Sequence, residues 1–260
     1  MTGPAASVHL VPEIRDRATV VTVTGTLGSE TYPDLRNGLL KIVTDAPDGV
    51  IADIGGLTIE EDRLASLFAT IALRIRDWPG VPFALVTPRP EHFVLLARQA
   101  VGRFVTVHPD VGTAERELDH PPRRRAVQLL AARVGASALA RQFIARVCAE
   151  WQVPEHTEDA LVIATELVEN TIRHTDSAPR LRLELRRGVF TVAVADDDPR
   201  PAVLHERVDS TDPGLGLQMV AQIARVWGCS GSWAGGKVVW AVLARAGGRA
   251  GDPGRVRRAP

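Results

Sequence analysis

A stripe of polar side chains recurs at four-residue spacing in the second half of the chain. Glu166, Asn170 and His174 stand at successive i+4 positions, so on a helix they share one face. An asparagine beside an acid can complete the coordination of Mg²⁺, an ion that prefers oxygen ligands and keeps some of its waters. Polar stripes are also typical of solvated helix faces, so these three residues alone leave both interpretations open.

Three further motifs follow in an order that suits nucleotide binding. A predicted strand ends near Asp196, a predicted helix opens at Gly214 and Gly216, and residues 235–238 lead into a last strand. A carboxylate at a strand end can accept the exocyclic amine of adenine. Adjacent glycines at a helix start let backbone N–H groups approach phosphate oxygens. The ordered set therefore indicates a nucleotide site in the second half of the chain.

The second half contains the helices and strands that must position these residues. Apolar residues recur at helical spacing after Ser137 and after Thr157, which we expect to cap helices that run to Trp151 and His174. Strands are expected at residues 180–186, 189–195 and 237–244, with a short helix near residues 217–227. Two helices followed by a sheet predict an α+β layer.

The first half shows a different pattern. Runs of β-branched residues at 18–23, 50–54, 81–86 and 105–107 alternate with helical periodicity at 31–43, 62–78 and 91–100. This alternation predicts an α/β sandwich with a mixed sheet. Residues 119–125 combine two prolines with three arginines and predict a linker. We therefore expect domains at 1–118 and 126–246, and a disordered Gly/Arg/Pro-rich tail at 247–260.

Composition and charge exclude several classes of protein. Lys and Arg number 31 and Asp and Glu number 31, so the net charge is zero. No global basic field exists to attract nucleic acid, and we expect no direct nucleic-acid partner. No apolar run approaches the ~20 residues of a membrane helix. Cys148 and Cys229 follow no metal-ligand spacing. These features favour a cytoplasmic protein without a membrane partner.

The ordered motifs of residues 124–245 resemble the GHKL (Bergerat) ATP-binding fold, an α+β sandwich, and within it the anti-sigma-factor serine/threonine kinases. The matching segments are Glu166–His174, Asp196, Gly214–Leu217 and the terminal Gly-Gly-Lys-x-Val-Trp. The resemblance implies that Glu166 is the general base, Asn170 the Mg²⁺ ligand and Asp196 the adenine contact. It further implies ATP contacts from His174, Gly214, Gly216, Leu217 and Val238.

Two residues depart from the pattern of that family. Asp198 replaces a glycine of the motif that begins at Asp196, and Val238 stands where a threonine that assists adenine binding is expected. Valine cannot donate or accept the hydrogen bond of a threonine, and one lost bond amounts to about 0.5–1.5 kcal/mol. We therefore expect weaker binding of ATP than is usual in the family.

Residues 9–118 resemble a STAS domain, a mixed α/β sandwich found in anti-sigma-factor antagonists. The resemblance rests on Val21–Leu27 and Val50–Thr58. Antagonists carry Asp-Ser-Ser-Gly at a helix N-terminus, whereas this chain has Glu61–Leu64, so Asp62 occupies the position of the phosphorylated serine. Asp62 is either a permanent mimic of the phosphate or the remnant of a lost site. In both cases it is a degenerate phosphoacceptor position.

The two resemblances together imply a regulator of the anti-sigma-factor kinase type. Such a protein uses ATP and Mg²⁺, and it binds a STAS-domain antagonist and phosphorylates it on serine in a partner-switching pathway; a sigma factor is a further expected partner. The alternative is a non-catalytic ATP-dependent scaffold, which would tolerate the loss of Glu166 whereas a kinase would not. Assembly into a homodimer is left open by the sequence.

Overall fold

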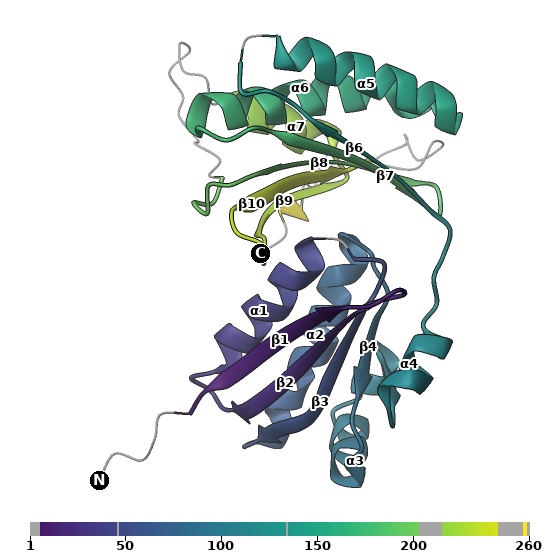
Figure 1. Cartoon of the computed structure of the whole chain (residues 1–260), viewed down its shortest axis with the longest axis vertical. Coiled ribbons are helices and arrows are strands. Elements are labelled where there is room, and N and C mark those ends of the chain that lie inside the picture. The colour runs from purple at the N-terminus through teal and green to yellow at the C-terminus, as the bar shows by residue number, and fades with distance from the viewer. Residues whose placement is uncertain (1–5, 46, 134, 203–214, 244–256, 259–260) are drawn as a thin grey trace. The chain divides into compact units, whose positions relative to one another are not determined.

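The computed structural model describes residues 6–45, 47–133, 135–202, 215–243 and 257–258. The chain divides into two compact units, residues 1–120 and 121–260. Each unit is built on its own β-sheet, and helices pack against each sheet (Figure 1).

The first unit contains a mixed sheet. Its described strands are β1 (Val8–Ile14), β2 (Thr19–Leu27), β3 (Val50–Ile59), β4 (Phe83–Val86) and β5 (Thr106–His108). They lie in the order β1-β2-β3-β4-β5, where β1 is antiparallel to β2 and the other neighbours are parallel. The parallel strands are rich in buried, β-branched residues, as expected for strands that are covered on both faces. The mixed α/β sandwich predicted for this half is confirmed.

Helices cover both faces of this sheet. They are α1 (Tyr32–Thr44), η1 (Asp62–Ala65), α2 (Ser66–Asp77), α3 (Pro90–Arg98), η2 (Val101–Arg103) and α4 (Val111–Glu117). The larger core joins the sheet to α1 and α2 through residues such as Leu39 and Phe68. A smaller core on the other face joins Val20 and Ile51 to Ala114 of α4. The crossover helices therefore bury the two faces that a parallel sheet exposes.

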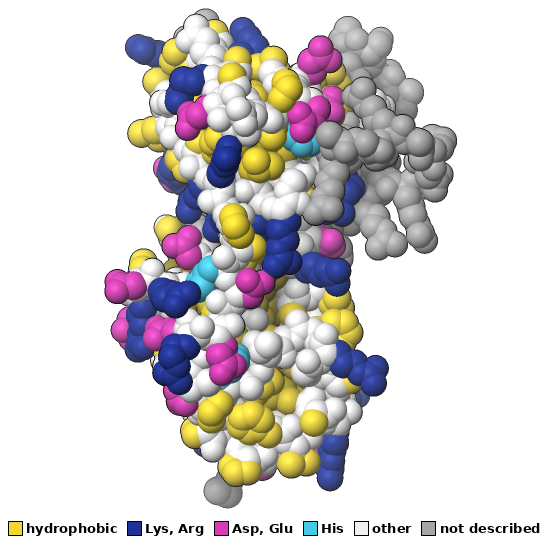
Figure 2. All heavy atoms as spheres, turned by 90° about the vertical axis from the view of Figure 1, so that its right-hand side faces the viewer, with side chains coloured by type: hydrophobic (Ala, Val, Ile, Leu, Met, Phe, Trp, Pro, Cys, Tyr) yellow, Lys and Arg dark blue, Asp and Glu magenta, His cyan; other side chains and the backbone are white. Residues whose placement is uncertain are grey.

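Part of the apolar surface of the first unit stays exposed. Figure 2 shows a face of this unit on which hydrophobic side chains gather. Phe93 and Val94 of α3, and Phe104 after η2, are among its exposed large apolar residues. Exposed apolar side chains are common in folded proteins, so they indicate no function by themselves.

The second unit contains a largely antiparallel sheet. Its described strands are β6 (Arg123–Leu129), β7 (Arg180–Arg186), β8 (Val189–Asp196), β9 (Val226–Gly231), β10 (Lys237–Val242) and β11 (Arg257–Arg258). They lie in the order β11-β9-β10-β8-β7-β6. Among the described strands of this second sheet, only β11 and β9 are parallel to each other, and the other neighbours are antiparallel.

The longer helices of the second unit pack on one face of its sheet (Figure 1). The helical elements are α5 (Ala136–Trp151), η3 (Pro154–His156), α6 (Thr157–His174) and α7 (Leu215–Ile223). Residues of α6 at spacings of three and four, among them Ile163, Leu167 and Val168, are buried in the core against Phe190 and Val192 of β8. Helices on one face of an antiparallel sheet form an α+β layer, so the fold class predicted for this half is confirmed.

The N-terminal strand of the second sheet lies where a linker was predicted. Arg123 to Arg125 are part of β6, which pairs with β7 from Arg123↔Arg186 to Leu129↔Arg180. Three consecutive arginines are not typical of a strand, so the sequence did not indicate one here. In the structure the charges of Arg123 and Arg125 are compensated by ion pairs with the buried carboxylate of Glu184 on β7. The predicted linker at residues 119–125 is therefore too long at its C-terminal end.

Other boundaries also differ from the predictions. The helix expected at residues 217–227 ends at Ile223, because Val226 and Trp227 pair with β10 as the start of β9. Ser137 caps no helix: α5 follows Gly135, and the Ser137 hydroxyl donates to Glu169 Oε1 at 3.2 Å. Thr157 is the first residue of α6 rather than its cap. Most of the predicted tail, 247–260, lies outside the described residues, whereas 257–258 form β11.

The close contact between Gly25 of β2 and the chain before β1 yields a test of the first unit. Gly25 has φ +102°, and a Cβ there would overlap the carbonyl oxygen of Ser7, which accepts from the N–H of Thr26. Gly25→Ala should lower the free energy of unfolding by about 1–2 kcal/mol or more. Gly102→Ala, in η2 with open space around it, should change it by less than about 0.5 kcal/mol. Thermal melting of both variants checks this, and equal melting temperatures would contradict it.

Candidate nucleotide site

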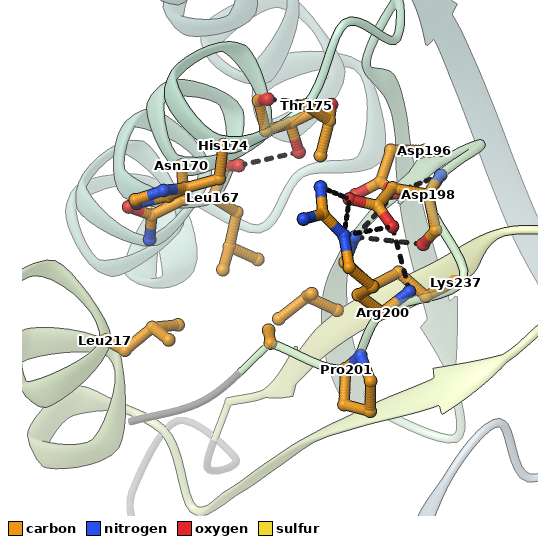
Figure 3. A pocket seen from close by; sticks show the side chains of 13 residues that line it. Leu167, Asn170, His174, Thr175, Asp196, Asp198, Arg200, Pro201, Leu217 and Lys237 are labelled. Atoms are coloured by element: carbon orange, nitrogen blue, oxygen red, sulfur yellow. Dashed lines mark hydrogen bonds and ion pairs between the residues drawn. The ribbon is translucent and has the colours of Figure 1, made fainter. Parts of the chain in front are cut away.

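A cavity of about 320 Å³ opens in the second unit between α6, the end of β8, the start of β10 and α7. Residues from segments far apart in the sequence meet there (Figure 3). The cavity is lined by Leu167, Asn170, Thr171, His174, Thr175, Asp196, Asp198, Arg200, Pro201, Ala202, Leu217, Lys237 and Val239. Its volume lies at the lower end of the range of about 300–1,000 Å³ that is usual for small-molecule sites.

Four of the predicted site residues meet in this cavity. Asn170 and His174 reach it from the last two turns of α6, Asp196 from the end of β8 and Leu217 from the first turn of α7. The apolar face of α6 is buried in the core, so helical periodicity turns the polar stripe toward the cavity. The stripe is therefore more than a solvated face at Asn170 and His174.

Asp196 has the most buried carboxylate of the residues that line the cavity. Its side chain is 1% exposed, and Oδ1 accepts hydrogen bonds from Lys237 Nζ at 2.8 Å and from the N–H of Asp198 at 2.9 Å. The ammonium of Lys237 also donates to the carbonyl of Asp198 at 3.0 Å. Among the described residues, nothing hydrogen-bonds to Oδ2 of Asp196. One oxygen is thus held by the protein, and the other can accept a donor on a ligand.

Lys237 was named in the sequence motif but was not predicted to line the site. Lys237 of β10 pairs with Asp196 in the antiparallel register of β10 and β8, so the two residues lie side by side. Only 8% of the lysine side chain is exposed. A buried lysine is rare unless it is paired. The signal in the sequence was therefore a lysine at the start of an otherwise apolar strand, after two glycines.

The segment after β8 is held by a second ion pair. The guanidinium of Arg200 binds both oxygens of Asp198, with Nε–Oδ1 at 3.0 Å and Nη2–Oδ2 at 2.7 Å. These side-chain bonds, the backbone N–H of Arg200 and the charge of Lys237 hold the pKa of Asp198 well below its ordinary value. Asp198, predicted as a departure from a family glycine, thus has a structural role here.

Glu166 lies next to the cavity rather than in its lining. A Cβ at Gly216 would overlap Glu166 Oε2 and would come within 3.6 Å of Asn170 Nδ2. The start of α7 therefore packs closely on the polar stripe of α6, and a larger residue at position 216 would require the Glu166 side chain to move. Burial raises the pKa of Glu166, and the neighbouring charge of Glu169 adds to this, whereas Arg173 opposes it. Gly216 thus lies against the carboxylate of Glu166, and its predicted contact with phosphate stays a prediction.

Val238 does not line the cavity, contrary to the prediction. Side chains alternate along a strand, so Lys237 and Val239 face the cavity while Val238, between them, faces the other side of the sheet. A valine at position 238 therefore removes no hydrogen bond from this cavity, and the expectation of weaker ATP binding loses its basis. The predicted phosphate contact Gly214 lies outside the described residues.

The predicted phosphoacceptor position lies in the first unit. Asp62 is the first residue of η1, just before α2, and its side chain is 64% exposed. Its Oδ2 lies 3.9 Å from Nη1 of Arg98 on α3. Its exposure leaves it accessible to a partner protein.

The donor set at the cavity fits a magnesium ion only with help from a nucleotide. Among the described residues, no group of three or more His, Cys, Asp or Glu side chains is placed so that it could hold a metal ion. Asn170 supplies one amide oxygen or nitrogen to the cavity, and Mg²⁺ is commonly held by one or two protein ligands together with substrate phosphates and waters. The chemistry of the site therefore fits a Mg–nucleotide complex better than a bare ion.

Comparison with known families places this site in a known type of domain. Residues 130–243 match the model of the histidine kinase-like ATPase domain, which confirms the predicted ATPase fold of the second unit. The match includes α5, α6, β7, β8, α7, β9 and β10. A comparison with curated proteins found no match. No helix among the described residues is long and apolar enough to cross a membrane.

Solved structures similar to this chain include anti-sigma factor antagonists. One from Mycobacterium paratuberculosis is 18% identical, with a TM-score of 0.38, and covers 42% of this chain and 95% of its own. The antagonist SpoIIAA in its unphosphorylated form is 14% identical, with a TM-score of 0.34 and the same coverages. RsbS of Moorella thermoacetica is 21% identical, with a TM-score of 0.34, and covers 40% of this chain and 88% of its own.

The raised pKa of Glu166 predicts a change in stability with a defined sign. Because the folded protein favours the protonated carboxyl, ionisation of Glu166 destabilises the fold at neutral pH and has no effect below the unfolded pKa. Glu166→Gln should therefore raise the melting temperature at pH 7 and leave it almost unchanged near pH 4. A lower melting temperature of the variant at pH 7 would show that the ionised carboxylate stabilises the fold instead.

Proposed function

We propose that this protein is an ATP-binding regulator of the partner-switching type, whose second unit phosphorylates a STAS-domain antagonist on serine. The observation that carries the proposal is the convergence of Asn170, Asp196 and Leu217 on one cavity of a histidine kinase-like ATPase domain. The mixed α/β fold of the first unit supports a role among proteins that exchange STAS partners, and a sigma factor is a further proposed client.

In this proposal the adenine ring enters the cavity with its exocyclic amine toward Asp196. Oδ2 of that carboxylate can accept the amine hydrogen, because Oδ1 is already bound by Lys237 and by the N–H of Asp198. Asn170, one turn from Glu166 on α6, would hold Mg²⁺ together with the phosphates. When bound, the ion neutralises the charge of the phosphates. The remaining chemistry falls to residues of this chain.

Glu166 is the proposed general base. Phosphoryl transfer needs a positioned acceptor hydroxyl, compensated charge and a base for the hydroxyl proton. The serine hydroxyl of the substrate would give its proton to Glu166 as its oxygen takes the γ-phosphoryl group and ADP leaves. A pKa raised by burial suits this role, because a carboxylate with a higher pKa accepts a proton more readily at neutral pH.

A non-catalytic ATP-dependent scaffold is the second candidate function. It is favoured by the position of Glu166, which packs against Gly216 and does not line the cavity. A scaffold would use the nucleotide only to stabilise one conformation of the ATPase unit around a partner. Replacement of Glu166 separates the two functions, because a scaffold has no need of a base.

The first test is nucleotide binding by the full-length protein. Asn170→Ala removes the proposed metal ligand and Asp196→Asn removes the charged acceptor. Each should weaken Mg-ATP binding at least tenfold, since a hydrogen bond to a charged group contributes about 1.5–3 kcal/mol. Asp197→Asn is the matched control, because Asp197 does not line the cavity and pairs with Arg180 instead. Titration calorimetry with and without EDTA gives the affinities.

Two results would remove this assignment of the site. One is a wild-type protein that binds ATP no better than the Asn170 variant. The other is an equal loss in the Asp197 control. Melting curves of each variant show whether a loss of binding reflects a loss of fold, and Asn170→Ala decides if the Asp196 variant is unstable.

The second test is phosphate transfer. With a STAS antagonist supplied in trans, Glu166→Gln should abolish phosphorylation of its serine and leave ATP affinity within about twofold, because the amide keeps the shape but cannot take the proton. In the wild type, the rate should fall on the acidic side at a higher pH than for an ordinary glutamate. Transfer is measured with γ-labelled ATP. Equal rates for the two proteins would exclude Glu166 as the base, and absence of transfer by the wild type would favour the scaffold.

A further inference from the structure

The ion pair between Asp198 and Arg200 lines two cavities of the second unit. The cavity of about 320 Å³ described above is joined by a second one of about 380 Å³, which reaches from the end of α6 to residues 197–200. Asp198 and Arg200 line both, together with His174 and Thr175. The guanidinium therefore stands at the mouth of the proposed nucleotide cavity, and Figure 3 shows it beside Asp196.

The orientation of this guanidinium is fixed by the protein. Three side-chain hydrogen bonds join it to the two oxygens of Asp198, and the backbone N–H of Arg200 donates to Oδ1 of the same carboxylate at 2.9 Å. A bidentate pair between arginine and a carboxylate sets the plane of the guanidinium as well as its position. The Arg200 side chain is 79% exposed, so its faces are not covered by protein and stay open to a ligand.

The fixed plane lies beside the proposed acceptor for the adenine amine. The backbone of Asp198 donates to Oδ1 of Asp196 at 2.9 Å, and its carbonyl accepts from Lys237. A chain of bonds thus runs from Lys237 through Asp196 and Asp198 to Arg200. Asp196 and Arg200 line the same cavity, so a base that binds Oδ2 of Asp196 can also contact this guanidinium. Planar guanidinium groups stack on aromatic rings, including the rings of nucleic-acid bases.

We propose that Arg200 is a base-contacting residue, which stacks its guanidinium plane on a purine ring held by Asp196. The inference rests on the proposed nucleotide-binding function and adds a contact that selects for an aromatic base. Asp198 is then the positioning residue that keeps Arg200 over the mouth of the cavity. The replacement of a glycine by Asp198 in this motif thereby gains a functional reason.

Two substitutions at Arg200 test the stacking contact in the full-length protein. Arg200→Ala removes both the plane and the charge, and Arg200→Lys keeps the charge alone. Both should raise the Kd of ATP about three- to thirtyfold, the range that a cation–π contact provides. The Kd of adenosine, measured by displacement of a fluorescent ATP analogue, should rise by the same factor because the contact involves the base. Arg180→Ala is the matched control, since Arg180 pairs with Asp197 at 2.8 Å and lines neither cavity.

The possible outcomes separate this inference from the proposed function. If the wild type binds ATP and Arg200→Ala binds it equally well, the stacking contact is overturned and the nucleotide site stands. If Arg200→Ala weakens the binding of ATP but not of adenosine, and Arg200→Lys binds ATP as the wild type does, then Arg200 contacts the charge of the phosphates. That result also overturns the stacking contact. An equal loss in Arg180→Ala would show that the loss is not specific to Arg200, which also overturns the stacking contact. A wild type that binds no ATP overturns both the proposed function and this inference.

Discussion

The buried ion pair between Asp196 and Lys237 is the interaction on which the site depends. It joins the end of β8 to the start of β10 where both side chains are almost fully buried. Removing one partner of such a pair leaves an uncompensated charge and destabilises a protein by about 3–5 kcal/mol. The pair also decides the chemistry of the cavity, because it uses one oxygen of Asp196 and leaves the other for a ligand. Asp198 and Arg200 then extend the same network to the mouth of the cavity.

A second constraint is the contact between α6 and α7. Gly216 brings the start of α7 onto Glu166, so the carboxylate is partly removed from water and its pKa rises. The same contact sets Asn170 beside the N-terminal turn of α7. A larger residue at position 216 would displace the Glu166 carboxylate from its place between the two helices. The site thus depends on one ion pair in the sheet and on the contact between α6 and α7.

The sequence predicted those parts of the fold that follow from periodicity. The 3.6-residue period of α6 placed Asn170 and His174 on one face, and the β-branched runs located β2, β3 and β8. Elements whose charges are compensated by distant residues were missed, and β6 is the example, because Glu184 lies 61 positions from Arg123. The sequence motif also did not predict which side chains of β10 face the cavity. Lys237 and Val239 face it, whereas Val238 was expected there. Only the register with β8 settles which side chains of that strand point toward the helices.

A structure of the protein with Mg²⁺ and a non-hydrolysable ATP analogue tests the central claim most directly. The account predicts the exocyclic amine of adenine within hydrogen-bond distance of Oδ2 of Asp196, with Lys237 still bound to Oδ1 and the metal ion on Asn170. An adenine ring bound away from Asp196, or a Lys237 that leaves the carboxylate to contact the nucleotide, would contradict it.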